Sequence, residues 1–192
     1  TGSTARRGEA LGHPYVAYDA VIRCEGELIA FVGDSENHDL LFPPAEQILD
    51  VDGSCIVPGF VDPHTHPVFA GSREDEFNRR LRGSSYMDIA AEGGGINSTV
   101  RATRTATSEE LLSGTLARLD TFLRHGTTTI EAKSGYGLDL DTEVRMLEVI
   151  RSANRRHAVD LVPTCLAAHE VPLEHRSDPD RWGRQLIDVI HP

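Results

Sequence analysis

The sequence predicts an α/β protein in which a short N-terminal β region precedes strands that alternate with helices. Two β-prone runs, residues 18–24 and 27–32, are separated by Glu25-Gly26 and predict a hairpin. With a third β-prone run at 48–51, residues 1–57 are expected to form a small all-β domain. Beyond this domain strands alternate with helical stretches, which is typical of βα units and a parallel sheet.

Three βα units are expected in residues 58–192. Their strands are predicted at the runs FVDPH (60–64), TTTIEA (127–132) and VDLVPTCLA (159–167). The first long helix begins at a capping box formed by Thr107 and Glu110. Asp141 is expected to cap the second helix, and the third helix is expected to begin at Asp180. The stretch 67–106 contains three consecutive glycines and is expected to hold a flexible loop near the site.

The composition excludes several classes of protein. The 192 residues are 39% hydrophobic and 26% charged, and no run reaches the roughly 18 apolar residues of a membrane helix. The net charge of −11 leaves no basic field for nucleic acid or anionic lipid, so an anionic substrate needs a cation inside its site. The three cysteines lack CxxC spacing, which argues against a disulfide framework or a thiolate zinc site. A small-molecule partner and a cytoplasmic location are expected.

His64-Thr65-His66 is the motif that indicates chemistry. Its two histidines stand at i and i+2 on a predicted strand, so both side chains point to one face with about 6.6 Å between their backbones. Neutral imidazole nitrogens bind Zn²⁺ or Fe²⁺. Two surface histidines are the alternative, because two ligands do not complete a metal site. The preceding Asp62 either orients a ligand histidine or simply ends the strand.

Four longer motifs extend this pattern. They are PGFVDPHTHPVFAGSREDEF, YMDIAAEGGGINSTVRATR, TTTIEAKSGYGLDLDTEVRML and VPTCLAAHEVPLE. In order and spacing they resemble the imidazolonepropionase family of the amidohydrolase superfamily over residues 18–176. The resemblance implies metal-dependent hydrolysis of the cyclic amide C–N bond of 4-imidazolone-5-propanoate to N-formimidoyl-L-glutamate, a step of histidine degradation. Pro67 and Glu170 depart from the family's usual residues without removing a functional one.

The resemblance also implies a fold. Residues 58–192 would form the first three βα units of a (β/α)8 (TIM) barrel of the metal-dependent hydrolase type, with the remaining units absent. Residues 1–57 would be the N-terminal part of a β composite domain. The chain starts without Met and stops after a helical run, so a piece of a longer protein is expected. A homodimer is implied for the full-length protein.

The resemblance assigns site residues individually. It makes His64 and His66 ligands of one divalent metal ion, zinc or iron. Arg73 would meet the substrate carboxylate, which a guanidinium matches through two parallel hydrogen bonds. Tyr136 and His169 follow the second and third strands and would contact the substrate.

Tyr86 is a further candidate for the same pocket. Each substrate candidate also has a structural interpretation. Arg73 can pair with Glu74 or Glu76 at the surface, Tyr86 can pack with Met87 and Ile89, Tyr136 can be a loop aromatic, and His169 can be a structural histidine.

The remaining catalytic groups are expected beyond Pro192, so no general acid or base is assigned and the chain alone is expected to be inactive. Lys133 ends the second strand rather than the fourth, which favours a single-metal site over one bridged by a carbamylated lysine. Two alternatives stay open. One is another amidohydrolase acting on a cyclic amide or heterocyclic amine, and the other is a noncatalytic domain with the same fold.

Overall fold

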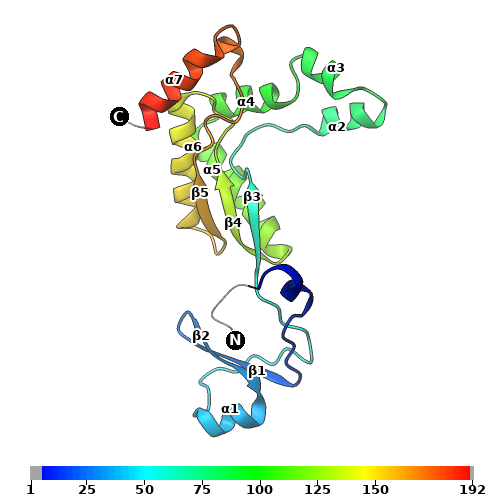
Figure 1. The fold of residues 1–192 in the computed structure, drawn as a ribbon, viewed down its shortest axis with the longest axis vertical. Helices are drawn as coiled ribbons and strands as arrows, with labels where there is room; N and C mark the ends of the chain where they lie inside the picture. The colour runs from blue at the N-terminus through cyan, green and yellow to red at the C-terminus, as the bar shows by residue number, and fades with distance from the viewer. Residues whose placement is uncertain (1–5, 191–192) are drawn as a thin grey trace. The chain divides into compact units, whose positions relative to one another are not determined.

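The computed structural model describes residues 6–190 and divides the chain into two compact units, residues 1–57 and 58–192 (Figure 1). Each unit is described by itself. No helix in the described part of the chain has the length and apolar content needed to cross a membrane. The assignment of the units to a composite domain and a barrel stays a prediction.

Unit 1 is built around the predicted hairpin. Strands β1 (Ala20–Glu25) and β2 (Leu28–Asp34) pair antiparallel, and Gly26 in the turn adopts a φ of 61° that favours glycine. A short 3₁₀ helix, η1 (Gly8–Gly12), precedes the strands. Helix α1 (Ser35–Leu41) follows them and packs against the hairpin through the rings of Phe31, His38 and Phe42.

The expectation of an all-β N-terminal region is wrong in two respects. Helix α1 forms because the Asp34 carboxylate accepts a hydrogen bond from the Asn37 backbone N–H and so caps the first turn. The run at 48–51 lies outside regular structure, and its side chains Ile48 and Leu49 are 85% and 87% exposed. This run pairs with no strand among the described residues, and a strand without a partner gains neither ladder hydrogen bonds nor burial.

Unit 2 contains a three-stranded parallel sheet in the order β3-β4-β5, which confirms the prediction of βα units. Its elements, in chain order, are β3 (Phe60–Thr65), α2 (Glu74–Leu81), α3 (Tyr86–Ala91), α4 (Ile96–Thr105), α5 (Ser108–Arg124), β4 (Thr127–Lys133), α6 (Leu140–Asn154), β5 (Asp160–Thr164), η2 (Leu173–His175) and α7 (Pro179–Ile190). The stretch 67–106 is therefore largely helical. Its triple glycine joins α3 to α4, with Gly95 as the N-cap of α4.

The helix starts follow local hydrogen bonds. The predicted capping box is present, because Thr107 and Glu110 each bond the other's backbone N–H. Helix α6 begins at Leu140, two residues earlier than a cap at Asp141 would give. Its N-cap is Asp139 rather than Asp141, since Asp139 accepts a hydrogen bond of 2.8 Å from the Thr142 backbone N–H.

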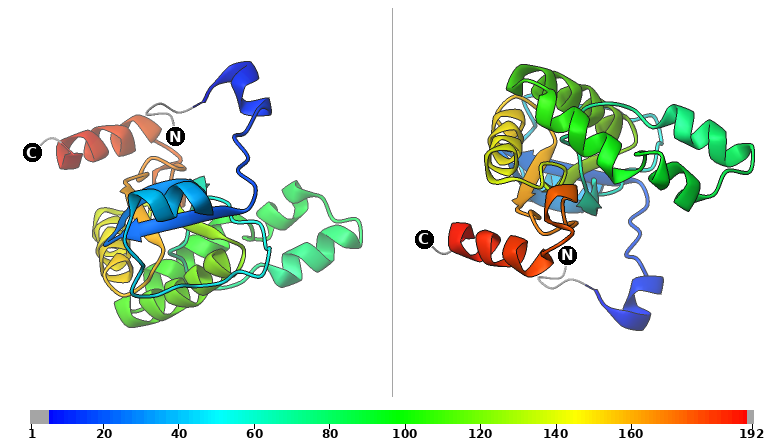
Figure 2. Two further views of the ribbon diagram at one scale, coloured as in Figure 1. Left: turned by 90° about the horizontal axis from the view of Figure 1, so that it is seen from below. Right: turned by 90° about the horizontal axis from the view of Figure 1, so that it is seen from above.

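One face of the sheet is covered and holds the core of unit 2. Helices α5 and α6 lie against this face (Figure 2). The buried apolar side chains between them and the strands include Leu111, Leu119, Ile130, Met146 and Ile150. The regular alternation of β4 places Ile130 and Ala132 toward these helices and Glu131 and Lys133 on the opposite face.

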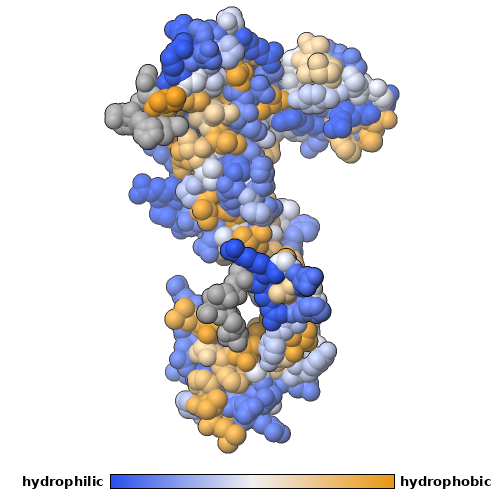
Figure 3. All heavy atoms as spheres, in the orientation of Figure 1, coloured by the Kyte–Doolittle hydropathy of each residue, from blue (hydrophilic) through white to orange (hydrophobic). Residues whose placement is uncertain are grey.

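The sheet has three strands, and no closed barrel is formed by the described residues. Apolar strand side chains remain exposed: Phe60 by 57%, Val61 by 66% and Val162 by 55%. Figure 3 shows apolar side chains at the surface of both units. Parallel sheets are normally covered on both faces, so this exposed strand surface is unusual for a sheet of this kind.

Candidate metal and substrate site

The predicted metal motif lies at the carboxyl end of β3. The Thr65 side chain is buried, and its Oγ1 donates a hydrogen bond of 2.6 Å to the Glu131 backbone carbonyl on β4. This bond holds the motif against the neighbouring strand. The rings of His64 and His66 lie 5.9 Å apart, centroid to centroid. Asp62 accepts a hydrogen bond from the His64 backbone N–H at 3.2 Å, so it fixes the main chain at the motif rather than an imidazole.

His66 is the centre of an aromatic cluster. Its ring stacks on His169 at 4.7 Å with an interplanar angle of 16°, and it lies 5.0 Å from the Tyr136 ring. Burial, and then repulsion from His169, lowers the pKa of His66 to about 4. The imidazole is therefore neutral at pH 7, which is the form that binds metal.

His169 has a defined tautomer. Its Nδ1 lies 3.0 Å from the Gly135 carbonyl oxygen, and because a carbonyl only accepts, Nδ1 carries the proton. In the neutral ring this leaves Nε2 as an acceptor. A Cβ at Gly135 would lie within 3.0 Å of His169 and of the Leu166 carbonyl, so only glycine permits this contact. The loop from β4 thus presents both Tyr136 and the surface on which His169 rests.

The residues present fit one part of a metal site. Within residues 6–190, no group of three or more His, Cys, Asp or Glu side chains is placed to hold a metal ion. His66 Nδ1, however, is buried without a hydrogen-bond partner in the structure. An orphaned, neutral imidazole nitrogen beside a second histidine is a suitable donor for a divalent cation. The pair supplies two ligands of the three or four that a catalytic site uses.

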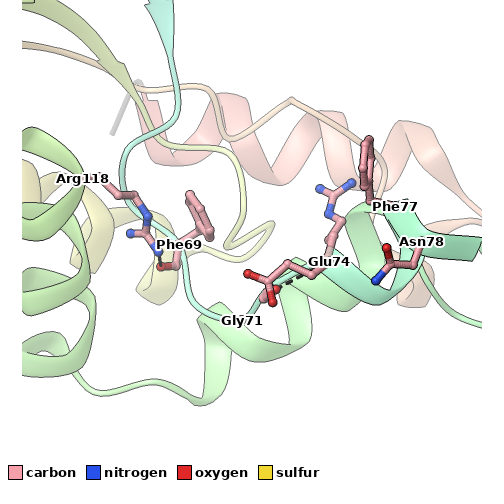
Figure 4. A pocket seen from close by; sticks show the side chains of 8 residues that line it. Phe69, Gly71, Glu74, Phe77, Asn78 and Arg118 are labelled. Carbon is pink, nitrogen blue, oxygen red and sulfur yellow. Dashed lines mark hydrogen bonds between the residues drawn. The ribbon is translucent and has the colours of Figure 1, made fainter. Parts of the chain in front are cut away.

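Arg73, the N-cap of α2, lines a groove that contains none of the cluster residues. Figure 4 labels Phe69, Gly71, Glu74 and Arg118 among the residues that line the same groove. Phe69 joins the two regions, because it lines the groove and packs edge to face on Tyr136 at 6.2 Å. Arg73 Nε donates to Thr99 Oγ1 at 3.0 Å. The alternative of a surface ion pair with Glu74 or Glu76 is not formed among the described residues, and Glu76 instead accepts the Gly95 backbone N–H.

Tyr86 is not brought to the cluster by any contact in the structure. It begins α3 and is 56% exposed. Its hydroxyl lies beside Gly95, where a Cβ would meet it at 3.4 Å. Of the six predicted site residues, His64, His66, Tyr136 and His169 therefore lie together, Arg73 is linked to them through Phe69, and Tyr86 lies with the α2–α4 segment.

A polar group, of which the sequence analysis named only Lys133, lies on the face of β4 opposite the helices. Lys133 Nζ donates to Glu131 Oε1 at 2.6 Å, and Thr164 Oγ1 donates to the same oxygen at 2.7 Å. These bonds lower the pKa of Glu131, and the nearby His64 acts in the same direction. The alternation within TTTIEAK places Glu131 and Lys133 on one face, so this group could have been found from the strand period.

The fold and the site together define an α/β protein with a parallel sheet and a histidine–tyrosine cluster at the carboxyl ends of its strands. This is where α/β enzymes place their active sites. No protein-family model matches the chain.

Comparison with known proteins shows which α/β proteins the chain is similar to. The chain is 55% identical to the imidazolonepropionase of Haloarcula marismortui over 172 residues, which are 88% of the chain and 40% of that protein. It is 45% identical to the imidazolonepropionases of Brevibacillus brevis and Alkaliphilus metalliredigens over 188 residues, or 96% and 97% of the chain and 44% of each protein. The chain is a homologue of the imidazolonepropionases, as its motifs predicted, and it spans less than half the length of these curated relatives.

Proposed function

We propose that this chain forms part of the active site of an imidazolonepropionase, which hydrolyses the ring C–N bond of 4-imidazolone-5-propanoate to give N-formimidoyl-L-glutamate. The observation that carries the proposal is the packing of His66 with Tyr136 and His169, residues from three separate segments. The homology supports it, because the relatives carry this name at 43–55% identity.

His64 and His66 would hold the single divalent ion, zinc or iron, together with ligands from outside residues 6–190. When bound, such an ion acts as a Lewis acid toward water and the ring carbonyl. The neutral state of His66 supports this assignment, since no proton has to leave the ring before it binds.

Arg73 would bind the propanoate carboxylate. The hydrogen bond to Thr99 uses Nε, and no hydrogen bond in the described part of the chain uses the two Nη atoms. These atoms can meet a carboxylate and provide the local cation that a chain of net charge −11 requires. Tyr136 and the Nε2 of His169 would orient the ring, because both lie against His66. Tyr86 lies beside Gly95 and has no role in this proposal.

The 192 residues by themselves are proposed to lack this activity. The described histidines provide two metal ligands, and the sheet leaves apolar side chains such as Val162 exposed. A homodimer of the full-length enzyme and a cytoplasmic location are further proposals, which rest on the resemblance and on the absence of any basic or disulfide pattern.

A chimera tests the function. The matched segment of the Haloarcula marismortui protein is replaced by the corresponding part of this chain, and turnover of imidazolonepropanoate and bound metal are measured. The chimera should hydrolyse the substrate, and His66→Ala should lower kcat/KM by at least about 100-fold and remove the metal. His125→Ala, at an exposed histidine after α5, is the control. A chimera that folds and binds metal but turns over only other cyclic amides would refute the substrate assignment.

A further inference from the structure

A buried glutamate holds the loop between β4 and α6. Glu143 lies in the first turn of α6 and is 2% exposed. Its Oε1 accepts the backbone N–H groups of Gly137 at 2.7 Å and Leu138 at 2.9 Å, and its Oε2 accepts that of Gly135 at 2.9 Å. A buried carboxylate is costly unless it is hydrogen-bonded, and here three main-chain donors meet that need.

A second side chain, Arg104, binds the carbonyl groups of the same loop. Arg104 of α4 donates to the carbonyl oxygens of Gly137 at 2.6 Å and Leu138 at 2.9 Å. Glutamate thus takes the loop's N–H groups while arginine takes its carbonyls. These bonds support the backbone of Leu138, which has a φ of 52°, a left-handed conformation that a residue with a branched side chain rarely adopts.

The clamped loop reaches the predicted site at two points. Tyr136 lies between two of the bonded residues, Gly135 and Gly137. The Gly135 carbonyl accepts the Nδ1 proton of His169, so the residue whose N–H binds Glu143 also fixes the His169 tautomer through its carbonyl group. A Cβ at Gly137 would lie 2.9 Å from Glu143 Oε1 and 2.8 Å from the Glu143 backbone nitrogen, which shows how closely the loop fits this carboxylate.

We propose that Glu143 is a positioning residue that sets the place of Tyr136 and the tautomer of His169, and through them the binding of substrate. The substrate in this inference rests on the proposed function, whereas the position of Glu143 in the loop rests on its hydrogen bonds. The required chemistry is specific to a carboxylate, because donors bind both of its oxygens. A glutamine has one acceptor oxygen, so its NH₂ group would face at least one backbone N–H.

The first measurement uses the 192-residue chain and does not depend on the reaction. The ¹⁵N shifts of the imidazole nitrogens report the tautomer of His169 at fixed pH, with chelator present. In the wild-type chain we expect the Nδ1–H form. Glu143→Gln should shift His169 toward the Nε2–H form, whereas Glu148→Gln, which removes a charge from an exposed position of the same helix, should not.

The second measurement separates positioning from folding. In the chimera described above, Glu143→Gln should raise KM for imidazolonepropanoate about tenfold with a smaller change in kcat, since ligand contacts are misplaced. Loss of stability alone would lower the amount of active enzyme and leave KM unchanged. If Glu143→Gln does not fold, Gly137→Ala tests the same loop with the carboxylate intact, because the added Cβ would lie 2.9 Å from Glu143 Oε1 and would displace the loop.

The outcomes are distinct. A wild-type His169 signature in Glu143→Gln, a KM within about twofold of wild type, or equal effects from Glu148→Gln would each overturn the positioning role. An inactive wild-type chimera would refute the proposed function, while the tautomer measurement would still decide the role of Glu143.

Discussion

The two faces of the parallel sheet should respond very differently to truncation of one side chain. Ile130 on β4 is fully buried against the helices, and Val162 on the neighbouring strand is 55% exposed. Ile130→Ala should destabilise unit 2 by about 2–5 kcal/mol, because it removes buried carbons and leaves a cavity. Val162→Ala should cost less than about 1 kcal/mol, since full burial of valine is worth about 1.5–3 kcal/mol and more than half of this side chain stays in water.

Urea unfolding followed by tryptophan fluorescence measures this difference. Trp182 is the only tryptophan in the chain and is 7% exposed within unit 2, packed with Ala167 and Leu186, so its signal reports that unit. The urea m-value should be the same in both variants, which would show that the midpoint shift reflects stability. Equal costs for the two substitutions would refute the reasoning, because they would mean that the Val162 face is covered in solution. Dependence of the cost on protein concentration would then identify a second copy as the cover.

Two further predictions concern His66 and the capping box of α5. The folded-state pKa of His66, about 4, lies below its ordinary value of 6.5, so in chelator its contribution to stability is complete above pH 6.5 and is lost as the pH falls toward 4. Allowing for partial exposure of the ring, the free energy of unfolding should fall by about 1–2 kcal/mol over this pH range. Urea titrations at several pH values would measure this fall, which should be absent in His66→Phe. A urea midpoint that does not change with pH over this range would contradict the prediction. Thr107→Ala should destabilise unit 2 by about 1 kcal/mol in the same assay, with Thr121→Ala on the exposed side of α5 as control, and an equal effect of the control would show that the cap is not responsible.

Much of the fold could be predicted because it depends on local signals. The Thr107 capping box, the β1–β2 turn at Gly26 and the alternating strand at 127–133 are each readable within a few residues. One error arose where tertiary partners decide. The run at 48–51 has β propensity but no paired strand in the described chain. The error at the start of α6 is local instead, because Asp139 and Asp141 are both residues that can cap a helix and the carboxylate of Asp139 is the one that reaches the Thr142 N–H.

The site was predicted unevenly for a related reason. His64 and His66 are two residues apart where β3 ends, so their proximity follows from the short spacing in an extended chain. The neighbours that change their chemistry come from far along the chain. His169 lies more than 100 residues from His66 in sequence, yet its ring stacks on His66 and is the second cause of the lowered His66 pKa. No local pattern contains that information.

In the segment Gly135-Tyr136-Gly137 the sequence identifies the tyrosine as a candidate site residue, but it does not reveal the contacts that hold the tyrosine in place. The tyrosine is conspicuous in the sequence, but each flanking glycine is required by a different distant neighbour. Gly135 must lack a Cβ because His169 rests on it, and Gly137 must lack one because α6 begins against it. The same two glycines expose the N–H groups that Glu143 binds. The position of Tyr136 is therefore set by contacts on both sides of it, and a substitution at Glu143 should alter the site without changing any residue that is proposed to meet the substrate.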